Sequence, residues 1–415
     1  MRSATRFYSP GACGRPDGIC GMKGGPSGKR HFEGPVVSMR VALLTHSNPF
    51  RQGVCEAILE GGAQVVAATE PRPRPPGLLR LRRMGGEAFR RAAPGLHAAF
   101  NSDPFYRFLR TRGIPCARVW RARDPRFGDW LRRLAPDVVV LSRFGQRLPA
   151  ELLTIPRLGF VNIHCSLLPK LRGPSPIHGA IILDHAESGV TLHVVDETID
   201  TGDILLQRRF SLDPQETNAS FTEKALRIMC PMVAEVIRML RTGRYARVPQ
   251  DHSEATYFSV RRTFGRFALI DWSAPARLID AVVRSGVPCH TRFKARAIRV
   301  WQARVAADTQ EQRARPGVVL ARADGWLTVM AADAPVELTV GRMRRNRWWS
   351  LRDYEDMTLA DMGGRGLLSS GRLPEVGTEL ETRPWPELRA RTARDRCNVW
   401  PRARAAGQKV ALDPG

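Results

Sequence analysis

The chain has 415 residues, with 65 Lys and Arg against 40 Asp and Glu, which gives a formal net charge of +25. Hydrophobic residues make up 43% of the sequence, enough to bury the cores of two or three domains, so a wholly disordered chain is excluded. The charge is typical of proteins that bind nucleic acids or anionic surfaces. Only 6 of the 65 basic residues are Lys, however, and so lopsided a ratio is also what codon bias produces.

The eight cysteines are scattered along the chain and form no CxxC pair, which is typical of proteins in a reducing cytoplasm. The sequence has no apolar run of about 18 residues, the length that a membrane-spanning helix needs. Its beginning also lacks the apolar stretch of a secretory signal. We therefore expect a soluble cytoplasmic protein that does not bind a membrane.

Changes of composition divide the chain into four parts. Residues 1–38 are rich in Gly, Pro and Arg without a period, and they predict either a disordered extension or a start codon assigned too far upstream. Residues 39–245 predict an α/β domain, and residues 251–345 predict a smaller β domain. From residue 363 to 415 Gly, Pro and Arg dominate again, so we expect a tail that is disordered or loosely attached.

In the first domain, buried strands alternate with helices. We expect strands at Val41–Thr45, Gln64–Thr69, Pro136–Ser142, Phe160–His164 and Gly189–Val195, and helices at Gly53–Glu60, 174–186 and 216–241. This alternation predicts a doubly wound, mostly parallel sheet.

A basic segment, residues 71–112, interrupts the alternation. It opens with PRPRPPG and carries ten Arg against two acidic residues. A helical insertion with a basic face fits this composition best. Such a face either binds an anionic acceptor or is simply solvated, and the solvated case is the commoner one.

The second domain consists of short strands around one helix. We expect strands at Ala268–Trp272, Ala297–Val305, Gly317–Ala321, Trp326–Ala331 and Val336–Val340, and a helix near Ala274–Ser285. Turn signals such as RPG and ADG separate the strands. The pattern predicts a small OB-like β-barrel.

Several common catalytic motifs are absent from the sequence. It has no GxxxxGK[ST] phosphate loop, no GxGxxG after the first strand, no GxSxG elbow and no HExxH. Nucleotide hydrolysis, hydride transfer and serine-esterase chemistry therefore lose most of their support.

The most informative stretch is GFVNIHCSLLPKLRG, residues 159–173. Asn162 and His164 are two residues apart on an expected strand, so they project from the same face near its carboxyl end, where open parallel sheets place their ligand sites. Further along, VVDETIDTGD at 194–203 places four acids in a turn after another strand. A carboxylate from this turn can orient or charge the imidazole.

Other interpretations of these residues remain. A lone His at a strand end is more often structural than catalytic, and an acidic turn is often only a solvated loop. A metal site of His164, Cys165, His178 and Asp200 is disfavoured because adjacent strand residues point to opposite faces, so we expect no metal. Cys165 is disfavoured as a nucleophile because nothing in the sequence around it lowers its pKa.

The run NIHCSLLPKLRG at 162–173, followed by Asp200 in a DTG turn, resembles the 10-formyltetrahydrofolate-dependent formyltransferase family. FGQRLPAELLTIPRLG at 144–159 resembles the folate-side loop of that family. ATYFSVRR, LIDWSAP, RVWQARV and RPGVVL occur in the order found in its C-terminal β-barrel domain. The resemblance covers roughly residues 39–345, and it makes residues 39–245 the catalytic domain.

This resemblance implies that an acceptor amine attacks the formyl carbon of 10-formyltetrahydrofolate through a tetrahedral oxyanion. By position, Asn162 donates to the oxyanion, His164 stabilises it or relays a proton, and Asp200 tunes His164 and helps to remove the amine proton. The residue types suit these roles, because an oxyanion-hole donor is worth about 3–4 kcal/mol and His moves protons readily near pH 7. No metal and no covalent enzyme intermediate are implied.

The resemblance also implies binding residues. The folate would be held by Gln146, Arg147, Leu148, Val195, Asp196, Glu197, Thr198 and Ile199. The acceptor substrate would be bound by Ser166, Arg172 and Gly173.

Two regions differ from the family members that act on methionyl-tRNA. The 70–113 segment does not resemble their shorter basic loop, and GVPCHT at 286–291 replaces a Trp- and Pro-rich turn. The sequence therefore favours a small-metabolite amine, such as an amino sugar or amino acid, as the acceptor. Initiator methionyl-tRNA is the alternative, supported by the domain arrangement, by SLLPKLRGPSP at 166–176 and by the basic charge. A non-catalytic nucleic-acid-binding protein is a third alternative, which leaves the intact catalytic set unexplained.

Overall fold

The computed structural model describes residues 38–46, 48–71, 104–119, 122–265, 267–293, 296–306, 314–342, 373–385 and 391–392. The expected extension at residues 1–38 lies outside the described residues except for Ser38, and so does most of the basic insertion. The end of that insertion forms the helix α4 (Pro104–Thr111), whose apolar side chains Phe105, Phe108 and Leu109 are buried.

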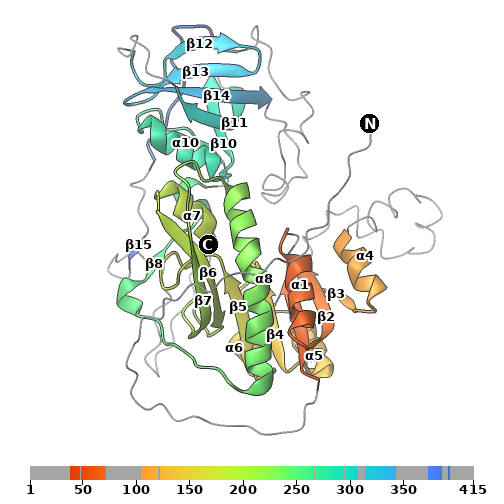
Figure 1. Cartoon of the computed structure of the whole chain (residues 1–415). Helices are drawn as coiled ribbons and strands as arrows, with labels where there is room; N and C mark the ends of the chain where they lie inside the picture. The colour runs from red at the N-terminus through yellow and green to blue at the C-terminus, as the bar shows by residue number, and fades with distance from the viewer. Residues whose placement is uncertain are drawn as a thin grey trace, which may run out of the picture. The chain divides into compact units, whose positions relative to one another are not determined.

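A seven-stranded sheet forms the first domain (Figure 1). Its strands are β1 (Arg40–Thr45), β2 (Gln64–Pro71), β3 (Cys116–Val119), β4 (Val138–Ser142), β5 (Phe160–His164), β6 (Glu187–Val194) and β7 (Ile204–Ser211), in the order β3-β2-β1-β4-β5-β6-β7. The pairs from β3 to β5 are parallel, whereas β5 with β6 and β6 with β7 are antiparallel. The predicted mostly parallel sheet is confirmed, and its two antiparallel strands lie at one edge.

Helices cover both faces of this sheet. The helices α1 (Arg51–Glu60) and α8 (Asn218–Thr242) lie side by side on one face (Figure 1). The opposite face carries α5 (Pro125–Leu134) and α6 (Ala150–Leu153), and α7 (Pro176–Ile182) follows β5 in the chain. Along β1, residues 41 and 43 belong to the hydrophobic core that includes α1 and α8, whereas residues 42 and 44 belong to the core that includes α5 and α6. The side chains of a strand alternate between its two faces, so both faces of the sheet are covered. The domain is therefore doubly wound.

The helix α8 has clear signals at both ends. The side chain of Thr217 accepts a hydrogen bond from the Ser220 backbone N–H in a reciprocal capping box. Gly243 ends the helix with a φ of 69°, a conformation that glycine adopts without a steric penalty. At 25 residues α8 is the longest helix described, yet neither it nor any other described helix is long and apolar enough to cross a membrane.

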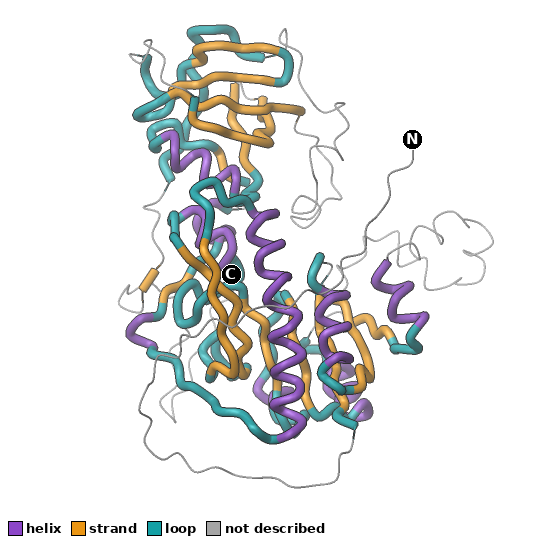
Figure 2. Tube along the Cα trace, in the orientation of Figure 1, coloured by secondary structure: helices purple, strands orange, loops and turns teal. Residues whose placement is uncertain are grey.

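A six-stranded sheet forms the second domain, seen as a separate group of strands in Figure 2. Its strands are β9 (Ala268–Leu269), β10 (Cys289–Phe293), β11 (Arg296–Val305), β12 (Val319–Ala323), β13 (Trp326–Met330) and β14 (Pro335–Arg342), in the order β12-β13-β14-β11-β10-β9. All pairs are antiparallel except β9 with β10. The helix α10 (Ala276–Arg284) packs against β11. The predicted second β domain is thus confirmed, and β10 is a strand that the sequence pattern did not predict.

Residues 373–385 depart from the expected disordered tail. Leu373 and Leu380 are buried against the second domain, and the Leu380 N–H donates to the carbonyl oxygen of Gly317 at 2.9 Å. The indole Nε1 of Trp385 donates to the carbonyl oxygen of Leu269 at 2.8 Å. This stretch is ordered because its apolar side chains and amides find partners that lie far away in the sequence.

A connecting segment joins the two domains. It contains the short 3₁₀ helix η3 (His252–Glu254), the strand β8 (Thr256–Tyr257) and the helix α9 (Val260–Phe264). The two-residue strand β15 (Arg391–Thr392) pairs with β8.

Candidate active site

A cavity of about 520 Å³ lies at the carboxyl ends of β4 and β5, beside the turn that follows β6. Parallel α/β sheets place their ligand sites at this edge. The cavity is lined by the expected catalytic residues Asn162, His164 and Asp200, by Gly173, and by all eight residues expected to hold the folate, namely Gln146, Arg147, Leu148, Val195, Asp196, Glu197, Thr198 and Ile199. Its volume is typical of a small-molecule site.

The strand β5 positions two of the catalytic candidates. Val161 and Ile163 belong to the core on the α1 and α8 side of the sheet. Asn162 and His164 alternate with them and line the cavity. The predicted placement of both side chains on one face is therefore what the structure shows.

His164 is held by a backbone carbonyl. Its Nε2 lies 2.9 Å from the carbonyl oxygen of Leu171, which can only accept, so Nε2 carries the hydrogen. Burial lowers the pKa of His164, while the nearby Asp200 carboxylate acts in the opposite direction. The neutral ring therefore has its free lone pair on Nδ1, which lies 3.6 Å from Oδ2 of Asp200. Nδ1 can take a proton beside a carboxylate that stabilises the resulting imidazolium.

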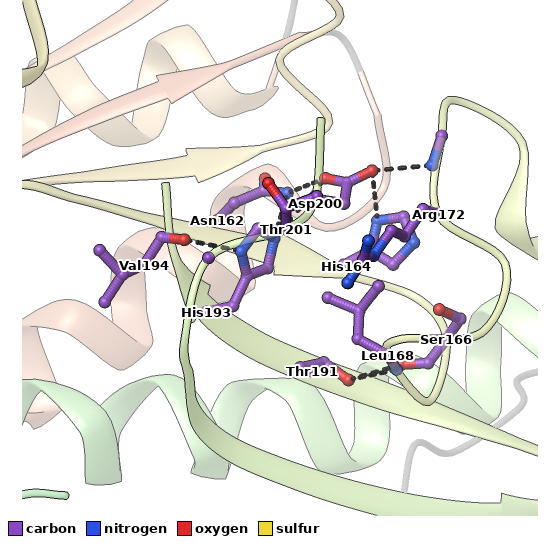
Figure 3. A network of polar contacts seen from close by, with 12 residues as sticks. Asn162, His164, Ser166, Leu168, Arg172, Thr191, His193, Val194, Asp200 and Thr201 are labelled. Atoms are coloured by element: carbon purple, nitrogen blue, oxygen red, sulfur yellow. Dashed lines mark hydrogen bonds and ion pairs between the residues drawn. The ribbon is translucent and has the colours of Figure 1, made fainter. Parts of the chain in front are cut away.

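Asp200 is fixed by donors from two other segments (Figure 3). Its Oδ1 accepts a 3.2 Å hydrogen bond from Nδ2 of Asn162, and its Oδ2 accepts a 2.8 Å hydrogen bond from the backbone N–H of Gly173. Burial by itself raises the pKa of Asp200, but His164, His193 and the Gly173 N–H outweigh burial and hold the pKa well below its ordinary value. The carboxylate is therefore ionised at neutral pH.

The amide of Asn162 is fully engaged (Figure 3). Its Nδ2 lies 3.1 Å from Nε2 of His193, in addition to its bond with Asp200. Nδ1 of His193 lies 2.8 Å from the carbonyl oxygen of Val194 and so carries the hydrogen, which leaves Nε2 as an acceptor. Both amide hydrogens of Asn162 therefore have partners, and an oxyanion must share or replace one of them.

The turn after β6 is shaped by its own side chains. Oδ1 of Asp196 accepts hydrogen bonds from the Thr198 backbone N–H at 3.0 Å and from Oγ1 of Thr201 at 2.6 Å. A Cβ at Gly202 would lie 2.0 Å from the carbonyl oxygen of Val194, so only glycine fits there. The DTG sequence thus permits the close return that brings Asp200 to the cavity.

The loop after β4 forms one wall of the cavity with residues 146–148. The side chain of Gln146 accepts from the Ala122 N–H at 2.9 Å, and Nη2 of Arg147 donates to the Glu197 carbonyl oxygen at 2.9 Å. Within the described part of the chain, the backbone of Arg147 and Leu148 makes no hydrogen bond to another backbone group. These backbone groups suit the polar edge of a flat heterocycle such as a pterin.

Two of the three expected acceptor-binding residues lie outside the cavity lining, which includes only Gly173. Oγ of Ser166 donates to the Lys170 carbonyl oxygen at 2.7 Å. Arg172 is 1% exposed, and its Nε and Nη2 donate to Oε1 of Gln250 at 3.1 and 2.5 Å. The side chains of Ser166 and Arg172 thus form hydrogen bonds to other residues of this protein, away from the cavity lining.

Cys165 also lines the cavity, but burial raises the pKa of its thiol to about 11. A protonated thiol is a poor nucleophile. The structure therefore gives no support to Cys165 as a catalytic nucleophile.

Several residues at the cavity are absent from the sequence prediction. His193 is 1% exposed. The sequence did not predict it as a site residue because it lies opposite Asn162 only through the antiparallel pairing of β5 and β6. His46 and Phe144 line the cavity with their rings stacked at 6.0 Å between centroids. Each follows the end of a predicted strand, so the rule that located His164 also applies to them.

Two protein-family models match the chain. The formyl transferase model covers residues 39–236, and the model of the formyl transferase C-terminal domain covers residues 266–354. The matches coincide with the two domains seen in the structure.

Curated relatives agree with these models. A methionyl-tRNA formyltransferase from Lachnospira eligens is 31% identical over 300 residues, which cover 70% of this chain and 88% of the relative. Another from Roseiflexus castenholzii is 38% identical over 225 residues, covering 53% of this chain and 70% of that one. A third, from Geotalea daltonii, is 34% identical over 258 residues, covering 60% and 81%.

Solved structures share the fold. The sugar 3N-formyltransferase WlaRD superimposes with a TM-score of 0.52 at 16% identity, covering 73% of this chain and 98% of that one. An N-formyltransferase from Helicobacter canadensis gives a TM-score of 0.51 at 15% identity, covering 72% and 98%. With both domain models matched and most of the L. eligens relative covered, this chain belongs to the formyl transferase family and is a folate-dependent formyltransferase.

Proposed function

We propose that this protein transfers the formyl group of 10-formyltetrahydrofolate to the amine of initiator methionyl-tRNA. The observation that carries the chemistry is the meeting of Asn162, His164 and Asp200 at one cavity. The acceptor is supported by relatives named methionyl-tRNA formyltransferase, one of which is covered over 88% of its length.

The cavity suits the formyl donor. The free backbone groups of Arg147 and Leu148 would hold the pterin on one side, and the turn from Val195 to Ile199 would hold it on the other. When bound, the folate supplies an activated formyl carbon. The protein has only to bind it, orient the amine and move protons.

Three side chains of the site move the protons and stabilise the charge that develops. Nδ1 of neutral His164 takes the proton that the attacking amine loses, and ionised Asp200 stabilises the imidazolium. Asn162 donates to the oxygen on which negative charge develops, and releases one of its present partners to do so. His164 then returns the proton to the departing folate nitrogen, so the catalyst is restored.

The expectation of a small-metabolite acceptor rested on two regions of the sequence. Most of the 70–113 segment lies outside the described residues. In the 286–291 region, residues 289–291 belong to β10, and Cys289 and Thr291 are fully buried. These positions form a domain core, so their sequence says little about tRNA contact. The 70–113 segment alone still favours the small-amine alternative.

A panel of acceptors tests the proposal. Purified protein and 10-formyltetrahydrofolate are incubated with charged initiator tRNA, uncharged tRNA, free methionine or nucleotide-linked amino sugars, and release of tetrahydrofolate is followed. We expect turnover with the charged tRNA, with a KM that rises steeply between low and physiological salt because phosphate contacts release counterions. Turnover restricted to a small amine, with a KM that is flat in salt, would overturn the tRNA proposal.

A further inference from the structure

We infer that two side chains of the connecting segment 248–258 are positioning residues for the catalytic site, Gln250 for Asp200 and Thr256 for His164. The inference rests on the catalytic roles proposed above for Asp200 and His164. Residues 248–258 are called the clasp below.

Gln250 links two loops of the site through one carboxamide. Its Nε2 donates to the carbonyl oxygens of Asp200 and Gly202 at 3.1 and 2.7 Å. Its Oε1 accepts from Nε and Nη2 of Arg172. A carboxamide has two hydrogens and two lone pairs, so this side chain, 6% exposed, uses its whole capacity.

The turn that Gln250 holds needs an external restraint. Asp200 adopts a φ of 55°, a left-handed conformation that Asp tolerates when its carboxylate bonds locally, whereas this carboxylate bonds to Asn162 and Gly173 in another segment. Such conformations persist only where the surroundings enforce them. On the far side of the turn, Val248 and Ile204 exchange backbone hydrogen bonds of 2.8 and 2.9 Å. The clasp therefore fixes the turn at two points.

The clasp also supports His164. Oγ1 of Thr256 accepts from the Leu171 N–H at 2.8 Å, and the Thr256 carbonyl oxygen accepts from the Arg172 N–H at 2.8 Å. Leu171 has a φ of 55°, and its carbonyl oxygen fixes Nε2 of His164. The loop that orients the imidazole is thus held by the clasp, as is the turn that carries the carboxylate.

This arrangement gives Arg172 a role outside the cavity. Its buried guanidinium binds Gln250, and its backbone binds Thr256. Arg172 would therefore orient the clasp, whereas the sequence pointed to a contact with the acceptor. A displacement of about 1 Å in a reacting group can lower the rate roughly 100-fold. A small displacement of the clasp, passed on to Asp200 and His164, should therefore lower kcat.

Gln250→Glu separates positioning from simple filling of the site. The carboxylate keeps acceptors for Arg172, but it has no hydrogens for the carbonyls of Asp200 and Gly202. We expect kcat to fall about 10- to 100-fold, with the KM for donor and for acceptor within about twofold of the wild type. Ser253→Ala is the matched control, because Ser253 is an exposed clasp residue whose Oγ, within the described residues, donates a hydrogen bond to Asp251 and to no group of the site. It should leave every parameter unchanged.

Hydrogen exchange of the 198–203 amides provides a readout that needs no acceptor. We expect faster exchange there in Gln250→Glu and wild-type rates in Ser253→Ala. Wild-type kcat together with wild-type exchange in Gln250→Glu would overturn the inference. If the wild-type protein formylates no acceptor, the proposed function fails, while the exchange result still decides the clasp.

Thr256→Val provides a second variant of almost unchanged shape. It removes the acceptor for the Leu171 N–H, and we expect faster exchange at residues 171–173 with a 3- to 10-fold lower kcat. Unchanged exchange and kcat in this variant would show that the clasp does not support His164. Should Gln250→Glu fail to fold, Thr256→Val still decides between these outcomes.

Discussion

The backbone N–H of Gly173 donates a 2.8 Å hydrogen bond to Oδ2 of Asp200, so the loop after β5 directly fixes the carboxylate carried by the turn after β6. Gly173 has a φ of 102°, and a Cβ at this position would lie 2.6 Å from Cε2 of Tyr257. The loop can deliver this N–H only because residue 173 has no side chain.

Gly173→Ala should therefore damage both stability and activity. The strained φ and the clash with Tyr257 together predict a loss of about 2–4 kcal/mol in the free energy of unfolding, and a lower kcat through misplacement of Asp200. Gly159→Ala is the control, because its φ is 75° but its Cβ would meet nothing within 4 Å. We expect a loss of about 1–2 kcal/mol there with normal kcat. Urea denaturation and steady-state kinetics make the comparison, and equal effects of the two substitutions would contradict it.

Substitution of the catalytic pair tests the chemistry. Asp200→Asn retains an oxygen for the Gly173 N–H but removes the charge beside His164, and His164→Ala removes the base. We expect each to lower kcat by roughly 10²- to 10⁴-fold, the usual contribution of acid–base catalysis. Circular dichroism should show a folded protein in both cases. A near-normal kcat in either variant would remove that residue from the mechanism.

The pH dependence of kcat follows from the state of His164. Burial lowers its pKa below the ordinary value of about 6.5, with His193 and Arg172 acting in the same direction and Asp200 opposing them. Because neutral Nδ1 takes the proton, activity is lost as the pH falls through this lowered pKa. The acidic limb of kcat should therefore have its midpoint below pH 6.5, and Asp200→Asn should move it lower still in the residual activity. A midpoint above 6.5, or an upward shift, would contradict this assignment.

His193 gives a prediction that the sequence alone did not offer. His193→Phe keeps a ring in the buried position but removes the acceptor for Nδ2 of Asn162. The amide then loses one of its two restraints, and we expect kcat to fall about 10-fold with little change in the KM for the donor. Isothermal titration with a non-reactive folate should give an unchanged Kd. If folate binding weakens as strongly as kcat falls, His193 shapes the donor site instead.

The strand carrying Asn162 and His164 could be predicted because a two-residue period alone places both side chains on one face. His193 could not, since its position opposite Asn162 depends on the antiparallel direction of β6, which a sequence of alternating elements does not reveal. The role of Arg172 depends on Gln250, 78 residues away. The family resemblance implied that Arg172 lies near the site, whereas its burial depends on tertiary contacts that the sequence does not show.

The same limit applies to β10 and to residues 373–385. GVPCHT stands where family members have a turn and was not predicted as a strand, yet its last three residues pair within the second sheet and are buried. Residues 373–385 lie in a stretch rich in Gly, Pro and Arg, but their partners belong to the second domain. Local composition cannot report a partner that is distant in sequence.

Truncation tests whether residues 373–385 are part of the second domain. A chain that ends at residue 345 loses the buried side chains of Leu373 and Leu380 and the Trp385 bond to Leu269. Burial of one leucine is worth about 1.5–3 kcal/mol, so the loss should lower Tm by several degrees. A chain that ends at residue 392 keeps these contacts and should melt like the full-length protein. Calorimetry decides the point. Equal Tm values for the two truncated chains would mean that residues 373–385 do not stabilise the fold, because the conformational entropy lost in ordering them would then offset the free energy gained from their contacts.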